Sequence, residues 1–193
     1  MRILITAGGT REPIDAVRYI TNLSSGRLGR TMADEARRRW HATALLAPDG
    51  DRPFRSTADL EEQLMRASKE SWDAVLHAAA VSDYRPAEVV QGKISSDRDE
   101  LVIRCVRTPK LIAHLRDWFP RAFLVGFKLT SGVAPEERAR IAREQISKNR
   151  TDACVENDLT EFGPGEHKAR IVTADRVIDI PKGDKASVGR ART

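Results

Sequence analysis

"RILITAGGTREPIDAVRYITNLSSGRLGR", residues 2–30, indicates the fold class of this 193-residue chain. It opens with a short apolar stretch, residues 2–6, that has the composition of a buried strand. From residue 25 to residue 40 the pattern is helical, and one face carries Leu28, Met32, Ala36 and Trp40. A strand that leads through a glycine-rich turn to a helix is typical of an α/β protein. The connection is unusual, because a βα turn normally needs only about 2–6 residues.

The alternation of strand and helix continues along the chain. Further strands are expected at 42–47, 72–80, 121–127 and 151–157, and further helices at 58–68 and 135–149. This order predicts a Rossmann-like α/β fold, a mostly parallel sheet with helices on both faces. Residues 93–106 and 168–180 are expected to add two β-hairpins. Residues 1–181 then form one domain, and residues 182–193, which show no periodicity, are expected to fray.

The composition, 40% apolar and 32% charged, is that of a soluble globular protein. No apolar run approaches the roughly 18–20 residues that cross a bilayer, and the N-terminus lacks the layout of a signal peptide. Cys105 and Cys154 are far apart, so we expect two reduced core thiols and a cytoplasmic location. The four histidines show no metal-ligand spacing and no Ser/His/Asp or Cys/His arrangement stands out, which argues against a protein-built metal site and a covalent nucleophile.

The net charge of +5 and the pI near 9.5 leave open whether the chain binds anions. The basic residues are scattered among acidic ones on helical faces, and aromatic residues make up only 5%. We therefore expect neither a nucleic acid nor a membrane partner. Small polyanionic ligands are the better functional candidates, while most of the charge is interpreted as solvated surface.

The unusual residues gather where strands of the predicted sheet end, at the edge where open α/β sheets bind ligands. The glycines of "TAGGT", residues 6–10, allow either a close ligand contact or a structural turn. "SSG", residues 24–26, can simply cap a helix, or it can bind an anion through the amides of the first helical turn. The neighbouring residues favour anion binding, because the same loop carries Arg11, Arg18, Asn22 and Arg27.

A second polar segment, "AAAVSDYRP" at residues 78–86, follows the third predicted strand. Its alanines allow a planar group to lie against the backbone, and Asp83 can accept hydrogen bonds from a ribose or simply cap the next turn. Lys93 is expected at the root of the first hairpin, where it is either exposed to solvent or a point-charge clamp for phosphate. His77, within the strand, is expected to be a packed or half-exposed histidine and not a catalytic base.

These segments resemble one family. "TAGGTREPIDAVRYITNLSSGRLG", "AAAVSDYRP" followed by "GKIS", "TPKLIA", "LVGFKL" and "VENDL" occur in the order found in phosphopantothenate–cysteine ligases, and the likeness covers residues 3–160. The resemblance implies that a carboxylate of 4′-phosphopantothenate attacks the α-phosphate of a nucleoside triphosphate, and that L-cysteine then displaces the nucleotide. It also implies Mg²⁺ with the triphosphate, CTP or ATP as co-substrate, and a homodimer. Because Met1 begins directly at the first strand, a stand-alone ligase is expected.

The resemblance also assigns roles to residues. It implies that Asn22 holds the acyl-nucleotide and that Lys93 acts on the triphosphate. The implied nucleotide-binding residues are Gly9, Ser24, Ser25, Gly26, Arg27, Ala79, Ala80, Asp83, Phe127 and Lys148, with Asn157 near a further polar position. The implied substrate-binding residues are Arg11, Arg18 and Asn22, and no residue is expected to bind a metal directly.

Three positions depart from the family pattern. The family's "SSGK" ends in Arg27 here, the lysine usual after "KI" is Ser95, and a glutamate common near the fourth strand is Ser131. These changes leave the choice between CTP and ATP open, with CTP favoured because the rest of the chain resembles bacterial members.

Two other function classes rest on single features. "TAGGT" is compatible with an NAD(P)-binding reductase of the short-chain type, although the three-glycine fingerprint and a Tyr-x-x-x-Lys pair are missing. The pI is compatible with a nucleotide-sensing or RNA-associated module, for which salt-dependent RNA binding without ligation would be the sign.

Overall fold

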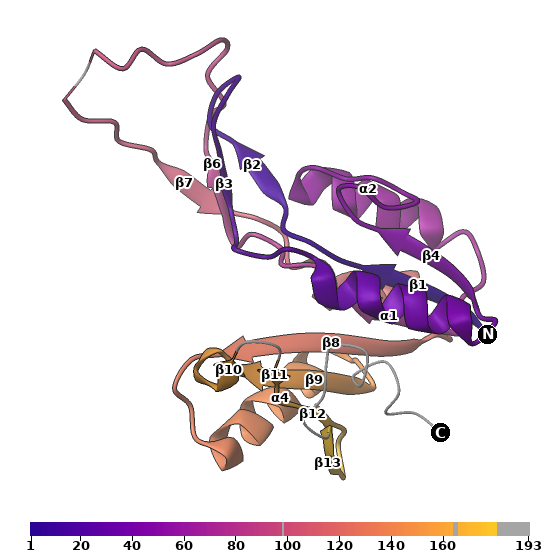
Figure 1. Cartoon of the computed structure of the whole chain (residues 1–193). Helices are drawn as coiled ribbons and strands as arrows, with labels where there is room; N and C mark the ends of the chain where they lie inside the picture. The colour runs from indigo at the N-terminus through magenta and orange to yellow at the C-terminus, as the bar shows by residue number, and fades with distance from the viewer. Residues whose placement is uncertain (98, 164–165, 181–193) are drawn as a thin grey trace.

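A computed structural model describes residues 1–97, 99–163 and 166–180, and the tail for which fraying was expected lies outside them. Within these residues, seven strands form one sheet and four α-helices pack on it (Figure 1). In spatial order the strands are β13 (Val177–Ile180), β12 (Ala169–Val172), β9 (Ala153–Asp158), β8 (Phe123–Thr130), β5 (Ala74–His77), β1 (Arg2–Thr6) and β4 (Ala42–Leu46). The helices are α1 (Arg27–Arg38), α2 (Thr57–Ala67), α3 (Leu111–Trp118) and α4 (Pro135–Asn149).

The five strands from β9 to β4 run parallel, β12 pairs antiparallel with β9, and β13 pairs antiparallel with β12. The chain starts at β1, places β4 on one side of it, and then crosses to β5 on the other side. This is a doubly wound topology whose switch point lies between β1 and β5. The predicted Rossmann-like, mostly parallel sheet is confirmed.

Helices cover both faces of the sheet because successive apolar side chains of a strand point to opposite faces. Leu4 and Leu124 face α2 and α3, whereas Ile5 faces α1. Cys154 faces α4, which lies on the same side as α2 and α3. The predicted arrangement of helices on both faces is therefore confirmed. Among the described residues, none of these helices is long and apolar enough to span a membrane.

The first helix is shorter than predicted. It begins after Gly26 and ends at Arg38, and Trp40 takes a left-handed conformation with φ of 61°. This turn redirects the chain into β4 and leaves the indole 94% exposed. Trp40 was therefore wrongly placed on the buried face, whereas Met32 and Ala36 are buried there as expected.

Two further expectations needed correction. Helix α3 was not predicted, because it is only eight residues long and has no side-chain cap, yet Leu111 and Leu115 are fully within the core. Both cysteines are free, but only Cys154 is a core thiol. Cys105 is exposed, because it lies in a short strand away from the main sheet.

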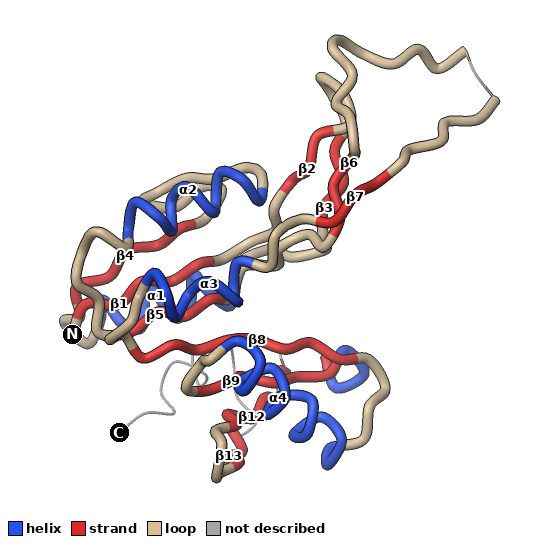
Figure 2. The backbone as a smooth tube through the Cα atoms, turned by 180° about the vertical axis from the view of Figure 1, so that it is seen from behind, coloured by secondary structure: helices blue, strands red, loops and turns tan. Residues whose placement is uncertain are grey.

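That short strand belongs to an arm, defined here as residues 11–21 and 84–107 without residue 98, that extends from the sheet (Figures 1 and 2). It contains two small antiparallel pairs: β2 (Arg11–Pro13) with β3 (Tyr19–Thr21), and β6 (Tyr84–Pro86) with β7 (Cys105–Arg107). The hairpin predicted at 93–106 is thus wrong in its bounds. Residues 84–86 supply the partner strand, and the residues between the pair form a long loop.

The second predicted hairpin is confirmed, since β12 and β13 pair antiparallel and Thr173 N donates to Arg176 O across the turn. Between β9 and β12 lie a short 3₁₀ helix (Leu159–Glu161) and the small pair β10 (Phe162–Gly163) and β11 (Glu166–His167).

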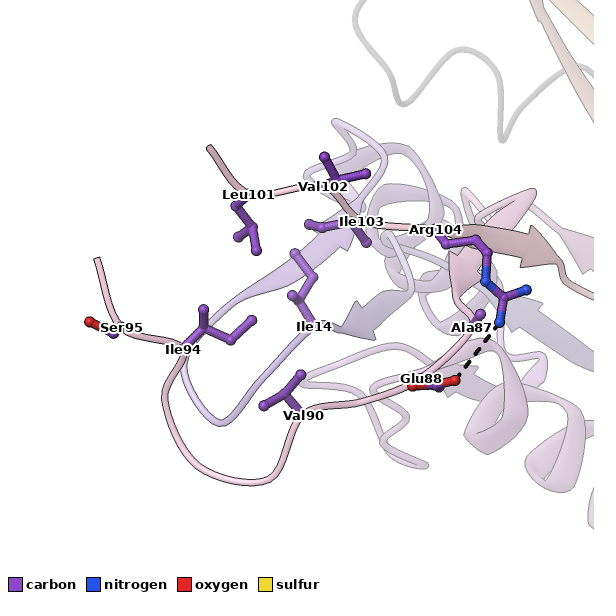
Figure 3. Close-up of a pocket in the computed structure, with 10 residues that line it drawn as sticks. All are labelled: Ile14, Ala87, Glu88, Val90, Ile94, Ser95, Leu101, Val102, Ile103 and Arg104. Atoms are coloured by element: carbon purple, nitrogen blue, oxygen red, sulfur yellow. Dashed lines mark ion pairs between the residues drawn. The ribbon is translucent and has the colours of Figure 1, made fainter. Parts of the chain in front are cut away.

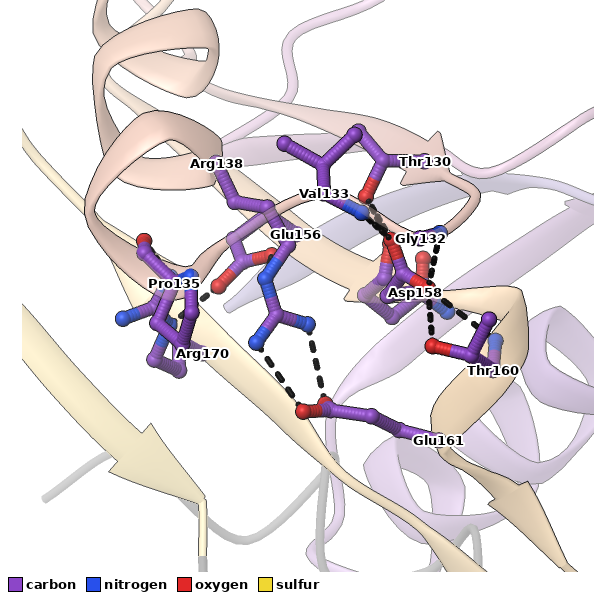
Figure 4. A network of polar contacts seen from close by, with 11 residues as sticks. Thr130, Gly132, Val133, Pro135, Arg138, Glu156, Asp158, Thr160, Glu161 and Arg170 are labelled. Carbon is purple, nitrogen blue, oxygen red and sulfur yellow. Dashed lines mark hydrogen bonds and ion pairs between the residues drawn. The ribbon is translucent and has the colours of Figure 1, made fainter.

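A buried polar network fixes the end of β9 to the start of α4 (Figure 4). Asp158 accepts hydrogen bonds from Gly132 N, Val133 N and the hydroxyls of Thr130 and Thr160. The Thr130 and Thr160 hydrogen bonds hold the pKa of Asp158 far below its ordinary value. The carboxylate therefore acts as a permanent anionic anchor for the loop that leads into α4.

Candidate functional site

The site is built where β1 and β5 end side by side at the switch point. Gly9 pairs with Ala80 in an isolated bridge, and Ala80 N donates to Gly8 O at 2.8 Å. A Cβ on Gly9 would lie 2.8 Å from Asn22 O, so a glycine lets the later segment come this close. The glycine turn is thus a platform on which residues 22–26 rest.

We call residues 22–26 the partition, because they lie between two cavities. The β1–β4 cavity, of about 810 Å³, is lined by Gly8, Gly9, Arg11, Tyr19, Thr21, Asn22, Leu23, Ser24, Ser25, Arg30, Pro48 and Asp49. The β5–β9 cavity, of about 300 Å³, is lined by Leu23, Ser24, Ser25, Gly26, Arg27, Leu28, Gly29, Ala78, Ala79, Ala80, Phe127, Leu129, Asn157 and Ala169. Three partition residues, Leu23, Ser24 and Ser25, line both. Ligands in the two cavities would meet at the partition.

Asn22 is held in place by the neighbouring strand end. Its Nδ2 donates to Val81 O at 3.0 Å, a contact that joins residues 59 positions apart in sequence. The amide nitrogen has a second hydrogen and the amide has an acceptor oxygen, so both remain chemically suited to a ligand. Asn22 therefore combines a fixed position with hydrogen-bonding capacity at the mouth of the β1–β4 cavity.

The partition ends at the N-terminus of α1. Gly26 occupies the N-cap position with φ of 69°, and the first turn contains no acidic residue. The hydroxyls of Ser24 and Ser25 accept hydrogen bonds from Gly26 N and Arg27 N, at 3.4 and 3.3 Å. The positive end of the helix dipole thus faces the cavities without an acidic side chain in that turn to offset it, an arrangement that favours anions.

Two guanidinium groups line the β1–β4 cavity. Arg11 lies over the ring of Tyr19, 5.1 Å from its centroid. Arg30 donates to Ser25 O at 2.8 Å and pairs with Asp49. Arg30 is not among the residues predicted from the sequence. Its position one turn after Gly26 was the available signal, since residues i and i+4 share a helix face.

Arg18 makes its side-chain contacts within the arm. It donates to Asp15 Oδ2 at 2.6 Å and to Ile94 O at 3.2 Å. Although burial opposes ionisation, hydrogen bonds from the backbone N–H groups of Val17, Ile94 and Arg18 lower the pKa of Asp15 to about 2. Asp15 and Arg18 therefore fasten the β2–β3 turn to the loop that carries Lys93.

Three predicted site residues lie elsewhere in the described structure. Asp83 is exposed and pairs with Lys110, outside the two cavity linings. Lys93 is exposed in the arm loop and not at a hairpin root. Lys148 lies in the last turn of α4, which ends where β9 begins. It is therefore at the amino ends of the parallel strands, opposite to the carboxyl ends where the two cavities lie. The other predicted residues, Arg18 excepted, line one cavity or both.

His77 lies at the end of β5, next to the glycine turn, and contacts it through Thr6. It is 6% exposed, which confirms that it is packed, and its Nδ1 lies 3.0 Å from the Thr6 hydroxyl. The same hydroxyl accepts a hydrogen bond from Ala79 N at 3.0 Å. Burial lowers the pKa of His77 to about 4, so the imidazole is neutral at pH 7. His77 acts on the site through Thr6 and Ala79.

The depressed pKa of His77 predicts acid sensitivity. Below about pH 6.5 the imidazole of His77 takes up a proton in the unfolded chain but not in the folded protein. The free energy of unfolding is therefore highest above that pH and falls as the pH drops toward 4. We expect His77 to contribute about 3 kcal/mol to the difference in unfolding free energy between pH 7 and pH 4. The free energy of unfolding, measured with urea across this pH range, should depend less on pH in His77→Gln than in the unchanged protein. Equal slopes for the variant and the unchanged protein would contradict this assignment.

The described residues contain no cluster of three or more His, Cys, Asp or Glu suited to a metal ion. Asp49, which lines the β1–β4 cavity, pairs with Arg30, and Asp83, which follows β5, pairs with Lys110. The Ser24 and Ser25 hydroxyls at the partition are oxygen donors of the kind that a hard cation accepts.

Comparison with known proteins gives a consistent result. The family model described as "DNA/pantothenate metabolism flavoprotein C-terminal domain" (DFP) matches residues 1–192. The coenzyme A biosynthesis bifunctional protein CoaBC of Thermococcus kodakarensis is 37% identical over 193 residues, which cover 95% of this chain and 48% of that protein. The chain thus spans about half the length of the curated relatives it matches.

Solved structures share the fold. The crystal structure of the DNA/pantothenate metabolism flavoprotein from Streptococcus pneumoniae superposes with a TM-score of 0.88 at 29% identity, and covers 98% of this chain and 95% of that one. A Cab2 variant, solved in complex with phosphopantothenate-cysteine, superposes with a TM-score of 0.77 and covers 97% of this chain and 83% of that one. At 17% identity, this second likeness shows the fold alone.

Proposed function

The chain belongs to the family of the C-terminal domain of DNA/pantothenate metabolism flavoproteins, and from this premise we propose that it joins L-cysteine to 4′-phosphopantothenate in coenzyme A biosynthesis. The observation that carries the proposal is the partition, which lies between the two cavities: the fixed amide of Asn22 lines the β1–β4 cavity, the start of α1 lines the β5–β9 cavity, and Ser24 and Ser25 line both. A reaction that first unites a carboxylate with a nucleoside triphosphate needs such a meeting point.

The proposed reaction has two steps. The substrate carboxylate attacks the α-phosphate of the nucleoside triphosphate, a P–O bond breaks, and pyrophosphate leaves. The amine of cysteine then attacks the acyl carbon, the C–N bond forms as the acyl C–O bond breaks, the nucleoside monophosphate leaves with the bonding electrons, and the amine proton passes to solvent. In the first step two anions approach each other, so the site must supply positive charge and hydrogen-bond donors.

We assign the acid to the β1–β4 cavity, where Arg11 and Asn22 lie, and the nucleotide to the β5–β9 cavity. Ala79, Ala80 and Phe127 then offer an apolar surface for the base, while Ser24 to Arg27 and the start of α1 bind the phosphates. Asn22, fixed on Val81 O, holds the acyl-nucleotide between the two cavities.

Lys93, Asp83 and Arg18 lie on or near the arm and enter this proposal as residues that act when ligands are bound. Mg²⁺ would supply charge neutralisation of the triphosphate, held by phosphate oxygens, waters and the serine hydroxyls of the partition. We favour CTP over ATP as co-substrate, and a cytoplasmic location, both predicted from the sequence.

A direct assay tests the function and the base preference together. The protein is mixed with 4′-phosphopantothenate, Mg²⁺ and either CTP or ATP, with and without cysteine, and products are followed by mass spectrometry. We expect cysteine-dependent formation of phosphopantothenoylcysteine with equal amounts of pyrophosphate and CMP. Folded protein that yields no acyl product with either nucleotide would refute the proposal.

We also propose a homodimer formed through the arm. In Figure 3, apolar side chains of the arm gather around a cavity of about 440 Å³, and they come from the β2–β3 turn and from both halves of the long loop. Several apolar side chains of the arm are exposed: Val17, Val90, Leu101 and Val102, at 60, 46, 44 and 78%. A second copy of the arm is apolar in the same way and is the occupant that this surface fits.

The variant Val102→Glu tests the dimer. Because Val102 is mostly exposed, the substitution should leave the monomer folded while it places a charge in the contact. We expect the mass measured by light scattering to fall from dimer to monomer at micromolar concentration. Met65→Glu, on the exposed side of α2, is the matched control and should leave the mass unchanged. A dimer that persists in Val102→Glu would exclude this surface.

A further inference from the structure

The ion pair of Arg30 and Asp49 lies in the β1–β4 cavity and has no role in the function proposed so far. Arg30 comes from the first part of α1, whereas Asp49 comes from the loop after β4, so the pair bridges two walls of the cavity. The guanidinium also donates to Ser25 O at 2.8 Å, within the partition. A Cβ on Gly26 would lie 2.3 Å from Arg30 Nη1, so the glycine leaves room for this crossing.

We propose that Arg30 is the residue that binds the reacting carboxylate of the acid, and that Asp49 occupies it until the acid enters. This inference rests on the proposed function and adds to it a substrate-binding residue with an internal competitor. In the structure the guanidinium already binds a carboxylate of the same chemical kind, and the arginine fork matches carboxylate geometry.

The position of Arg30 distinguishes the carboxylate from the phosphate of the same substrate. Its contact with Ser25 O lies in the partition, which the β5–β9 cavity shares. The carboxylate must reach this boundary to attack the α-phosphate. Arg11 lies at the base of the arm, on β2, and the phosphate at the other end of the molecule can extend in that direction.

Asp49 can serve as the competitor because it is anionic at neutral pH and accessible. Its side chain is 67% exposed, and the Arg30 hydrogen bond holds its pKa below the ordinary value. An exposed ion pair of this kind contributes little to stability, so an incoming carboxylate can replace Asp49 without a large energetic cost.

The test measures binding of 4′-phosphopantothenate and of its carboxamide by calorimetry, without nucleotide. Arg30→Gln should weaken binding of the acid about 10- to 100-fold and leave binding of the carboxamide unchanged. Arg30→Lys should lie between, since it keeps the charge but loses the fork. Asp49→Asn should tighten binding of the acid several-fold, because the competitor is gone.

The sign of the Asp49 effect separates this inference from a structural role. If the pair only braced the loops, Asp49→Asn and Arg30→Gln would both weaken binding, and the inference would be overturned. Equal loss of acid and carboxamide in Arg30→Gln would assign Arg30 to the phosphate and overturn it as well. Glu62→Gln, which breaks an exposed pair with Arg66 on α2, is the control and should change neither affinity.

Failure of the wider proposal would look different. Unchanged protein that binds neither the acid nor the carboxamide would refute the ligase assignment itself. Unchanged protein that binds and turns over the acid, together with an Arg30→Gln variant that binds it equally well, would refute only the role of Arg30. Circular dichroism melts of each variant confirm that the compared proteins are folded.

Discussion

Replacement of Asn22 by Asp is expected to lower the turnover rate of phosphopantothenoylcysteine formation by about 100- to 1000-fold. The substitution keeps the shape of the side chain and changes only its hydrogen-bonding character and charge. In the structure Asn22 Nδ2 donates to Val81 O at 3.0 Å. A carboxylate cannot donate to that carbonyl, so the side chain would turn away from the position that the neighbouring strand end imposes.

The charge adds to the geometric effect. All three proposed reactants at the partition, the carboxylate, the triphosphate and the acyl-nucleotide, are anionic. An aspartate at position 22 would repel them at the place where the helix N-terminus and Arg27 are arranged to attract them. Because the interaction lost is one that stabilises the transition state, kcat should fall by a larger factor than the apparent affinity for substrate.

A matched control is Asn149→Asp. Asn149 Nδ2 also donates to a backbone carbonyl, that of Gln145, at 2.8 Å, but at the far end of α4. This variant should lose some stability and keep its turnover rate. Turnover of Asn22→Asp within about threefold of the unchanged protein would remove Asn22 from the proposed mechanism.

The main sheet could be predicted from the sequence because its elements are set by local patterns. Apolar runs of five to nine residues alternate with amphipathic helices, and right-handed crossovers leave few arrangements for such an order. The same logic located the carboxyl edge, where Gly9, Ser24 and Ala80 indeed come together. Local pattern and global topology agree in this part of the chain.

The arm could not be predicted in the same way, because its strands are three residues long and one of its two pairs joins segments far apart in the sequence. Residues 84–86 pair with 105–107 across a long loop, whose turn-forming residues predicted a shorter hairpin at 93–106. Lys93 was misplaced for this reason. Arg30 was missed for a different reason: its partner Asp49 becomes a neighbour only once α1 packs beside β4.

The largest effect on stability is expected for Arg138→Met, which should lower the free energy of unfolding by about 3 kcal/mol. Arg138 is 5% exposed and Glu156 only 1%. Arg138 donates two hydrogen bonds to Glu161, at 2.9 and 3.0 Å, and its Nε lies 3.7 Å from Glu156 Oε2 (Figure 4). Neither of these last two atoms has a hydrogen-bond partner. Their attraction is thus purely electrostatic, within a buried environment that screens it weakly.

Removal of Arg138 would leave the buried Glu156 carboxylate with Arg170 as its remaining cationic partner. It would also release Glu161, whose pKa the Arg138 hydrogen bond holds below the ordinary value. The loss should appear as a melting temperature lower by roughly 6–12 °C. Arg140→Met on the same helix is the control: Arg140 is 58% exposed and pairs with Glu137 and Glu144, so its removal should leave the melting temperature nearly unchanged. If both variants melt alike, burial does not strengthen the Arg138 network, and the anchor between β9 and α4 lies instead in the hydrogen bonds of Asp158.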